Sequence, residues 1–280
     1  MVKHYLPSSF QEALEIKHQE DVMLIAGGTD LMVQHRTWSE LPPQFDKPLL
    51  FLFNLAELKY IKKDANTLYI GSMTDLETLL YHNDTPPCLK DIIALMASPA
   101  IRYVCTLAGN IVNASPAADS LLALYALDAK LVLTSLKEER IVSIESFITG
   151  PRQTIIKSNE IIKEIQLPHQ PFNRVHFKKI GGRKSDAISK LAFLGLANVN
   201  QDHQIDTFRI VLNAVAPTLI RLHETERTVE GLSLEAFKHQ KDALLEAYNT
   251  AIKPIDDQRS NRTYRRQAAL NLIRQFIETL

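Results

Sequence analysis

The sequence has few cysteines, and this limits the redox centres that it can build. Its 280 residues include only Cys88 and Cys105. Two thiols cannot supply the four ligands of an ordinary 2Fe–2S cluster, so any iron–sulfur chemistry has to reside on another chain. Cysteines in this small number also fit a reducing compartment, and we expect a cytoplasmic protein.

Net charge and long apolar runs are missing as well. The 32 basic and 32 acidic residues cancel, so no global field attracts nucleic acid or an anionic membrane. The longest apolar runs, such as LLFLF at 49–53, fall far short of the ~18 residues of a membrane span. The N-terminus turns polar where a signal peptide would have its apolar region. We therefore expect no nucleic-acid partner and no membrane.

Several common catalytic motifs are also absent. The chain contains no G-x-G-x-x-G and no P-loop, which disfavours the usual nucleotide sites. It has neither an H-E-x-x-H pair nor a G-x-S-x-G elbow. Metalloenzyme and hydrolase interpretations therefore have little support, and we expect no metal site.

Periodicity and turn residues divide the chain into three parts. Residues 1–55 indicate a small α/β unit, 56–170 an α+β unit, and 171–280 an antiparallel sheet covered by helices, with a boundary in the proline-rich stretch 168–174. Ser9 with Glu12, and Thr74 with Glu77, predict capping boxes. The patterns predict strands at 22–26, 49–54, 60–64, 67–73, 129–136, 140–147, 160–168, 174–180, 190–199 and 208–215. They predict helices at 10–18, 30–36, 75–82, 87–98, 116–127, 219–231, 234–252 and 262–280.

The first candidate site is AGGTDL at 26–31, between a predicted strand and a predicted helix. Two adjacent glycines let the backbone approach a ligand and adopt positive φ, and the helix offers free N–H groups to an anion. A diphosphate is the natural ligand. A tight turn without any ligand explains the same pattern equally well.

The second candidate site is TLAGNIVNASPAADS at 106–120. Its hydroxyl and amide side chains can donate to a polar, phosphorylated ligand, Gly109 permits close approach, and Pro116 is expected in the first turn of a helix with Asp119 close behind. The alternative is a loop whose Asn and Ser side chains cap their own backbone.

A third candidate is FKKIGGRKSDAIS at 177–189, where Lys179 and Arg183 flank a second double glycine. These cations could hold an anion or the edge of a flavin, although a run of charge is more often a solvated face.

Together these segments resemble the FAD-binding subunit of the molybdenum hydroxylases, the xanthine dehydrogenase and carbon monoxide dehydrogenase family. AGGTDL is similar to that family's first flavin loop, and TLAGNIVNASPAADS to its second, T-[IL]-G-G-N-I-x-N-A-S-P-x-x-D. The likeness continues through FITGPRQTIIKSNEIIKEIQLP, FKKIGGRKSDAIS and NAVAPTLIRLHETERTVEG, in the family's order. It therefore covers nearly the whole chain.

The resemblance implies an α+β protein with the FAD-binding fold of vanillyl alcohol oxidase and MurB, made of two α/β subdomains, followed by a C-terminal antiparallel sheet with helices. It implies non-covalent FAD, with the diphosphate on residues 24–31 and other parts of the cofactor on the later positions. Lys179 would approach the isoalloxazine and tune it, and Ile162 would pack near the ring or the adenine. The residues that the resemblance assigns to FAD are Leu24, Ile25, Ala26, Gly27, Gly28, Thr29, Asp30, Leu31, Thr106, Gly109, Asn110, Ser115, Asp119, Ile162 and Lys179.

The function implied is electron transfer. A large subunit would carry molybdopterin, a small subunit the 2Fe–2S clusters, and FAD on this chain would pass electrons to NAD⁺ or another acceptor. Ala108 departs from the family's second glycine, and its Cβ costs ~1 to 2 kcal/mol if that position requires positive φ. Two alternatives remain open: a stand-alone flavoenzyme of the MurB or alcohol oxidase type, and a flavin-free assembly module.

Overall fold

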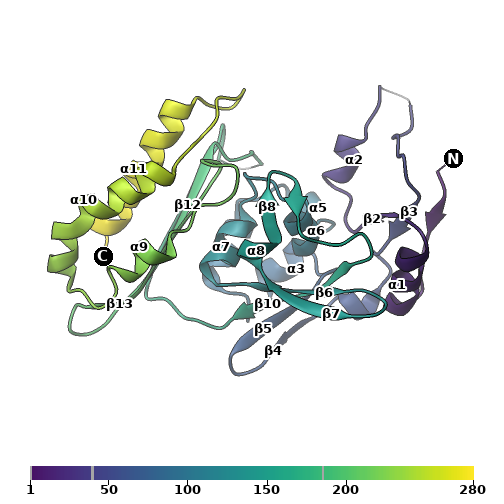
Figure 1. Ribbon diagram of the computed structural model, residues 1–280, viewed down its shortest axis with the longest axis horizontal. Helices are drawn as coiled ribbons and strands as arrows, with labels where there is room; N and C mark the ends of the chain where they lie inside the picture. The colour runs from purple at the N-terminus through teal and green to yellow at the C-terminus, as the bar shows by residue number, and fades with distance from the viewer. Residues whose placement is uncertain (1, 39–40, 185) are drawn as a thin grey trace. The chain divides into compact units, whose positions relative to one another are not determined.

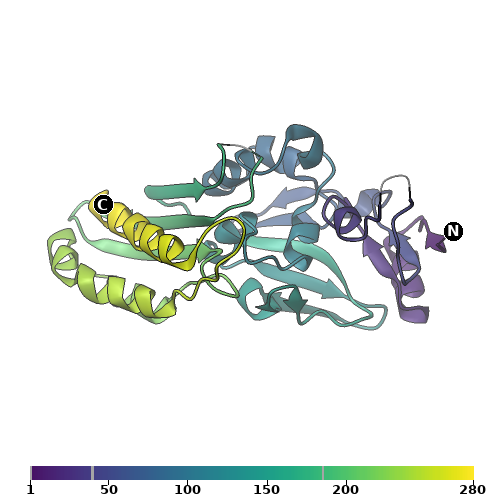
Figure 2. The same cartoon turned by 90° about the horizontal axis from the view of Figure 1, so that it is seen from above.

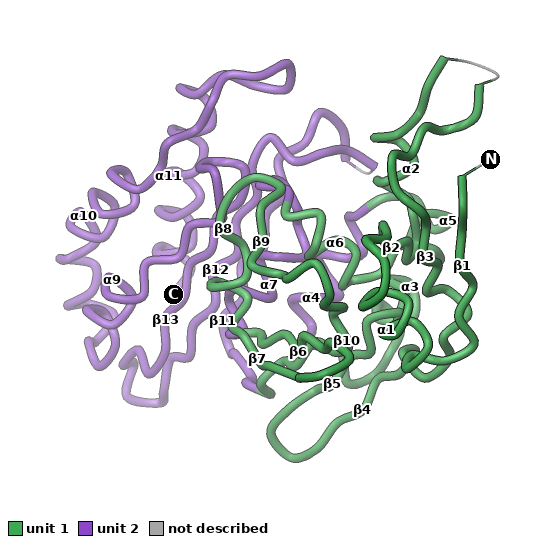
Figure 3. The backbone as a smooth tube through the Cα atoms, turned by 45° about the vertical axis from the view of Figure 1, so that its right-hand side comes forward, with its two compact units in different colours: residues 1–85, 97–114, 129–169 green, residues 86–96, 115–128, 170–280 purple. Residues whose placement is uncertain are grey.

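The chain forms two compact units that are interleaved along the sequence (Figure 3). The computed structural model describes residues 2–38, 41–184 and 186–280. Unit 1 consists of Met1–Thr85, Ala97–Ala114 and Ala129–His169, and unit 2 of Pro86–Met96, Ser115–Asp128 and Gln170–Leu280. The three domains expected from the sequence, 1–55, 56–170 and 171–280, stay a prediction.

Unit 1 begins with a three-stranded parallel sheet in the order β1-β3-β2 (Figure 1). Ser9 caps the first helix as predicted, because its hydroxyl accepts from the N–H of Glu12. The Glu12 carboxylate accepts from Ser8 instead of returning to the cap. The elements of this part are β1 (His4–Tyr5), α1 (Phe10–Gln19), β2 (Met23–Ile25), α2 (Leu31–Gln34), β3 (Leu49–Phe51) and the 3₁₀ helix η1 (Ala56–Leu58).

The larger sheet of unit 1 has five antiparallel strands in the order β4-β5-β10-β6-β7. A two-stranded ribbon, β8-β9, and four short helices accompany it. The strands are β4 (Ile61–Lys63), β5 (Thr67–Gly71), β6 (Lys130–Thr134), β7 (Glu139–Ser143), β8 (Ile148–Gly150), β9 (Gln153–Thr154) and β10 (Ile161–Pro168). The helices are α3 (Leu76–Tyr81), α5 (Pro99–Arg102), α6 (Leu107–Val112) and α8 (Ile144–Phe147).

Unit 2 is built on a three-stranded antiparallel sheet, β11-β12-β13, with apolar residues buried on both faces. α10 and α11 pack side by side (Figure 2). α11 lies against β12, where Gly195 makes room for the ring of Phe276. α4 contacts β11, and α7 contacts β12 and β13. Alternate residues of β12 therefore enter two different packing layers. The elements are α4 (Pro87–Ala94), α7 (Ser120–Ala126), β11 (Arg174–Ile180), β12 (Leu191–Val199), β13 (Ile205–Asn213), α9 (His223–Arg227), α10 (Leu234–Ala251) and α11 (Arg262–Glu278).

Most predicted strands and the long helices α10 and α11 are confirmed, but the predicted strand 140–147 ends at Ser143, and residues 144–147 form the helix α8. The predicted helix 219–231 is reduced to α9. The prediction that Thr74 and Glu77 form a capping box is wrong. Asp75 caps α3, because its side chain accepts from the N–H of Thr78, and Glu77 is buried against Arg102. The helix expected from Pro116 begins only at Ser120. Local polar side chains offered more than one possible cap, and tertiary packing selected between them.

Candidate functional site

The AGGTDL segment of unit 1 follows β2 and leads into α2. An added Cβ at Gly27 would lie 2.1 Å from the carbonyl oxygen of Val104, so glycine is required there by backbone packing. Gly28 has a φ of +68°, and its added Cβ would meet only side chains at 3.4 Å. The first glycine is thus explained by the fold alone, whereas the second supplies the left-handed turn that opens the loop.

The loop presents backbone donors. Within the described part of the chain, no protein acceptor is seen for the N–H groups of residues 27–30. Asp30 precedes α2 without capping it, since its carboxylate accepts from Gln34 instead. Free N–H groups in a glycine turn are suited to bind the oxygens of a phosphate.

The second segment begins with a short helix where a loop was expected. Thr106 is the N-cap of α6, and its hydroxyl accepts from the N–H of Gly109 at 3.0 Å. Ala108 lies inside this helix and is not among the positive-φ residues of the described chain. The strain that an alanine would have caused there does not arise, which removes the one observation that favoured a flavin-free module.

The two glycine segments meet in unit 1. An added Cβ at Gly109 would lie 3.9 Å from the Cβ of Ala26, and Gly27 packs on Val104 and Cys105, directly before the second segment. Farther along, the amide of Gln34 on α2 donates to Asn113 at 3.2 Å. The fold therefore brings together two segments about 80 residues apart in the sequence, as a shared phosphate ligand requires.

The other two residues of unit 1 that the resemblance assigns to FAD, Asn110 and Ile162, differ in their surroundings. Asn110 is partly exposed on α6 and has a polar partner of its own. Ile162 is buried on β10, paired with Leu133 of β6, and α6 contacts that strand. Their contacts with FAD stay predictions.

Asp119, Lys179 and their neighbours form a buried cluster in unit 2. The ammonium of Lys179 lies 2.8 Å from Asp119 Oδ2, and the two side chains are only 5% and 6% exposed. The same ammonium donates to the carbonyl of Leu95 at 2.8 Å. The idea that the cations at 177–189 are a solvated face is therefore wrong for Lys179. It fits Arg183, which is exposed and donates to the carbonyl of Asp186; Ser185 lies outside the described residues.

Two members of this cluster were not singled out from the sequence. Ser189 Oγ and Asn213 Nδ2 both donate to Asp119 Oδ1, at 2.6 and 2.9 Å. Asn213 stands at the end of the apolar run FRIVLN, and a polar residue in a buried strand was the available signal. The cluster lies in unit 2, as do residues 115–120 of the second segment, whereas AGGTDL and residues 106–114 lie in unit 1.

The thiols and carboxylates show no sign of a metal centre. Burial raises the pKa of Cys88 to about 12 and that of Cys105 to about 11, so both are thiols at neutral pH. No group of three or more potential ligands was found among residues 2–38, 41–184 and 186–280. Over the same ranges, no helix has the length and apolar character needed to cross a bilayer.

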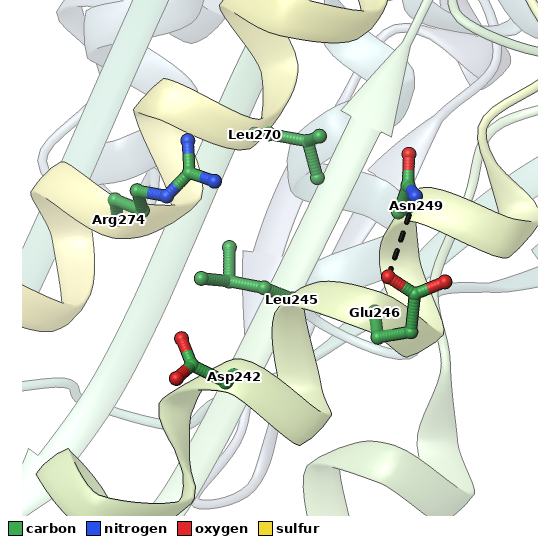
Figure 4. Close-up of a pocket in the computed structure, with 6 residues that line it drawn as sticks. All are labelled: Asp242, Leu245, Glu246, Asn249, Leu270 and Arg274. Atoms are coloured by element: carbon green, nitrogen blue, oxygen red, sulfur yellow. Dashed lines mark hydrogen bonds between the residues drawn. The ribbon is translucent and has the colours of Figure 1, made fainter.

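A hollow between α10 and α11 has a volume of about 240 Å³ (Figure 4). Asp242, Glu246 and Arg274 at its rim are exposed, and Arg274 already donates to Asn271. The hollow is a surface groove between two helices, and we assign no function to it. Its lining residues are Asp242, Leu245, Glu246, Asn249, Leu270 and Arg274.

Comparisons with known proteins confirm the resemblance seen in the sequence. Residues 1–170 match the family described as the FAD binding domain in molybdopterin dehydrogenase, and residues 176–280 the CO dehydrogenase flavoprotein C-terminal domain. The chain is 32% identical to the caffeine dehydrogenase subunit beta of Pseudomonas sp. (strain CBB1), over 80% of this chain and 77% of that protein. It is 29% identical to the xanthine dehydrogenase FAD-binding subunit of Escherichia coli O157:H7, over 86% and 82%.

The fold agrees with that of a solved structure. A chain of reconstituted CO dehydrogenase from Oligotropha carboxidovorans matches with a TM-score of 0.88 and 24% identity, over 99% of this chain and 96% of that one. Together with the two family matches, which cover almost every residue, this shows that the chain belongs to the FAD-binding subunits of the molybdenum hydroxylases, oxidoreductases of the CO and xanthine dehydrogenase type.

Proposed function

We propose that this chain is the electron-transfer subunit of a molybdenum hydroxylase complex in the cytoplasm. A small partner subunit supplies electrons from 2Fe–2S clusters, a large one carries molybdopterin, and NAD⁺ or another acceptor removes the electrons. The relatives support this because two of them are named as a subunit beta and a FAD-binding subunit. The chain's own two cysteines support it as well, since they cannot hold such clusters.

The observation that carries the proposal is the meeting of the two glycine segments in unit 1. N–H groups of residues 27–30 would hold the diphosphate, and Thr106 with Gly109 would line the adjoining stretch of the cofactor. FAD supplies the redox chemistry when bound, taking up electrons and passing them on. The protein's part is to bind the cofactor without a covalent bond and to keep it oriented.

Lys179 and Asp119 form an ion pair within unit 2, and the resemblance assigns both residues to FAD. An ammonium has three N–H donors, and Asp119 and Leu95 use two of those of Lys179. One donor is left for the cofactor, where a positive charge stabilises a reduced, anionic flavin. Because the ion pair with Asp119 is buried, Lys179 is held in place before any ligand arrives.

The test is made on the purified chain with one equivalent of FAD. We expect a yellow protein that releases free FAD on mild denaturation. It should reduce an artificial acceptor with NADH, since flavin and nicotinamide exchange hydride directly. The same chain without FAD is the control, and neither form should oxidise a purine.

Two outcomes would contradict the proposal. A chain that stays colourless through FAD titration would be a flavin-free module. A FAD-loaded chain that oxidises a substrate unaided and does not react with NADH would be a stand-alone flavoenzyme of the MurB or alcohol oxidase type.

A further inference from the structure

Asn213 is the least exposed polar residue of the buried cluster, and both ends of its amide are used. It is 0% exposed. Its Oδ1 accepts from the backbone N–H of Ala192 at 2.5 Å, and its Nδ2 donates to Asp119 Oδ1 at 2.9 Å. The backbone donor fixes which end of the amide is oxygen, so the NH₂ must point to the carboxylate. Asn213 thus gives Asp119 a donor without adding a charge.

Ala214, the residue after Asn213, makes a second hydrogen bond to the segment that contains Asp119. Ala214 has a φ of +57°, and its N–H donates to the carbonyl of Pro116 at 2.8 Å. The carbonyl of Ala214 accepts from Arg265, which is 4% exposed and also bonds Asp257 at 2.6 Å. The end of β13 therefore fixes residues 116–119 at two places and is itself fixed by α11.

We propose that Asn213, with Ser189 beside it, is a positioning residue for FAD binding, acting through the orientation of the Asp119 carboxylate. The inference rests on the proposed function, in which Asp119 is assigned to the FAD site. Two donors on Oδ1 and the ammonium of Lys179 on Oδ2 leave the carboxylate one orientation. A buried carboxylate that loses a donor is both less stable and free to rotate away from the cofactor.

A pH test of this amide has to take account of the charged groups that lie near it. Lys179 of β11 pairs with Asp119. Arg265, which pairs with Asp257, donates to the carbonyl of Ala214, the residue after Asn213. α4 contributes the carbonyl of Leu95.

The experiment replaces the amide by a carboxylate of the same shape. Asn213→Asp keeps the acceptor for the N–H of Ala192 but turns the donor to Asp119 into a second anion. We expect the dissociation constant for FAD, relative to wild type at the same pH, to rise at least tenfold at pH 8. At pH 5 it should return to within about threefold, because two carboxyl groups this close share a proton that one can donate.

The control is Asn271→Asp, the same change at an exposed position of α11. It should bind FAD as wild type does at both pH values. A loss of affinity in Asn213→Asp that is equal at pH 5 and pH 8, or no loss at either, would overturn the inference.

A second variant covers the case in which Asn213→Asp does not fold at pH 8. Ser189→Ala removes one donor from the same oxygen without adding charge, and we expect a three- to tenfold weaker affinity at an unchanged circular dichroism spectrum. Wild-type affinity in that variant would overturn the inference. Wild-type chain that fails to bind FAD would instead count against the proposed function, so the two failures are distinguishable.

Discussion

At the scale of single residues, the two adjacent glycines of the first segment have different reasons to be glycine. Gly27 is required by the carbonyl of Val104, which an added Cβ would overlap at 2.1 Å. Gly28 is required by its φ of +68°, with space for a side chain around it. A methyl group at these two positions therefore tests packing and backbone strain separately.

We predict that Gly27→Ala lowers the free energy of unfolding by about 3 kcal/mol, because backbone cannot yield as a flexible side chain does. Gly28→Ala should cost about 1 kcal/mol, the strain of a Cβ in the left-handed region. Urea unfolding measures both values, and FAD titration should rank the variants in the same order. Equal costs would mean that the close approach of Gly27 to Val104 is not maintained in solution.

At the scale of elements, a buried carboxylate connects the edge strand β7 to the turn before β10. Glu160 has no exposed side-chain area and accepts twice from Arg140 of β7, at 2.7 and 3.0 Å. The N–H of Lys157 donates to it at 2.7 Å. Burial acts to raise the pKa of Glu160, but the hydrogen bonds from Arg140 and Lys157 outweigh it, and the pKa lies below its usual 4.5.

We predict that Glu160→Gln destabilises the chain by about 2 kcal/mol at pH 7, since the guanidinium loses a charged partner. A carboxylate with a lowered pKa contributes stability above its usual pKa and loses it as the pH falls through the folded value. The difference from wild type should therefore be full at pH 7 and shrink below about pH 4.5. Urea unfolding at several pH values measures it.

The matched control is Glu138→Gln, which breaks the exposed pair between Glu138 and Lys157. It should change stability by less than about 0.5 kcal/mol, as surface ion pairs do. If both variants cost the same at every pH, the ion pair between Glu160 and Arg140 does not hold β7 to this turn.

At the scale of the whole molecule, the chain consists of two compact units whose segments alternate along the sequence. Each unit has its own apolar core. AGGTDL and residues 106–114 belong to unit 1, and residues 115–120 belong to unit 2 with the cluster around Asp119. A ligand that binds only the folded chain stabilises it against unfolding.

We predict that FAD at a hundredfold excess over its dissociation constant adds about 2.7 kcal/mol to the free energy of unfolding. Calorimetry of the chain with and without FAD should show unfolding at a higher temperature when FAD is bound. Riboflavin, which lacks the diphosphate and adenosine, should give a much smaller shift. An equal shift with riboflavin would contradict a role of the glycine segments in binding the diphosphate.

The sequence by itself determined the family, the order of most longer elements and the two glycine segments, but not the short elements β1, α5, α6, α8, β8 and β9. These features depend on local rules, since a glycine turn between a strand and a helix, or an apolar strand such as Leu191–Val199, is visible within a short window. For the same reason most predicted strands and the helices α10 and α11 were confirmed. The second half of the predicted strand 140–147, which is helix α8, and the helix starts with competing caps at Thr74 and Pro116 were not.

Only the tertiary structure decided what each of these residues contacts. Ala108 departs from the family pattern, yet its helical φ, and therefore the absence of strain, follows from α6 and could not be read from the motif. Asn213 and Lys179 meet Asp119 across 94 and 60 residues of chain, because the packing of α7 on the sheet of unit 2 brings them together. Such partners depend on which buried polar groups need a donor, and this is settled only when the elements have packed.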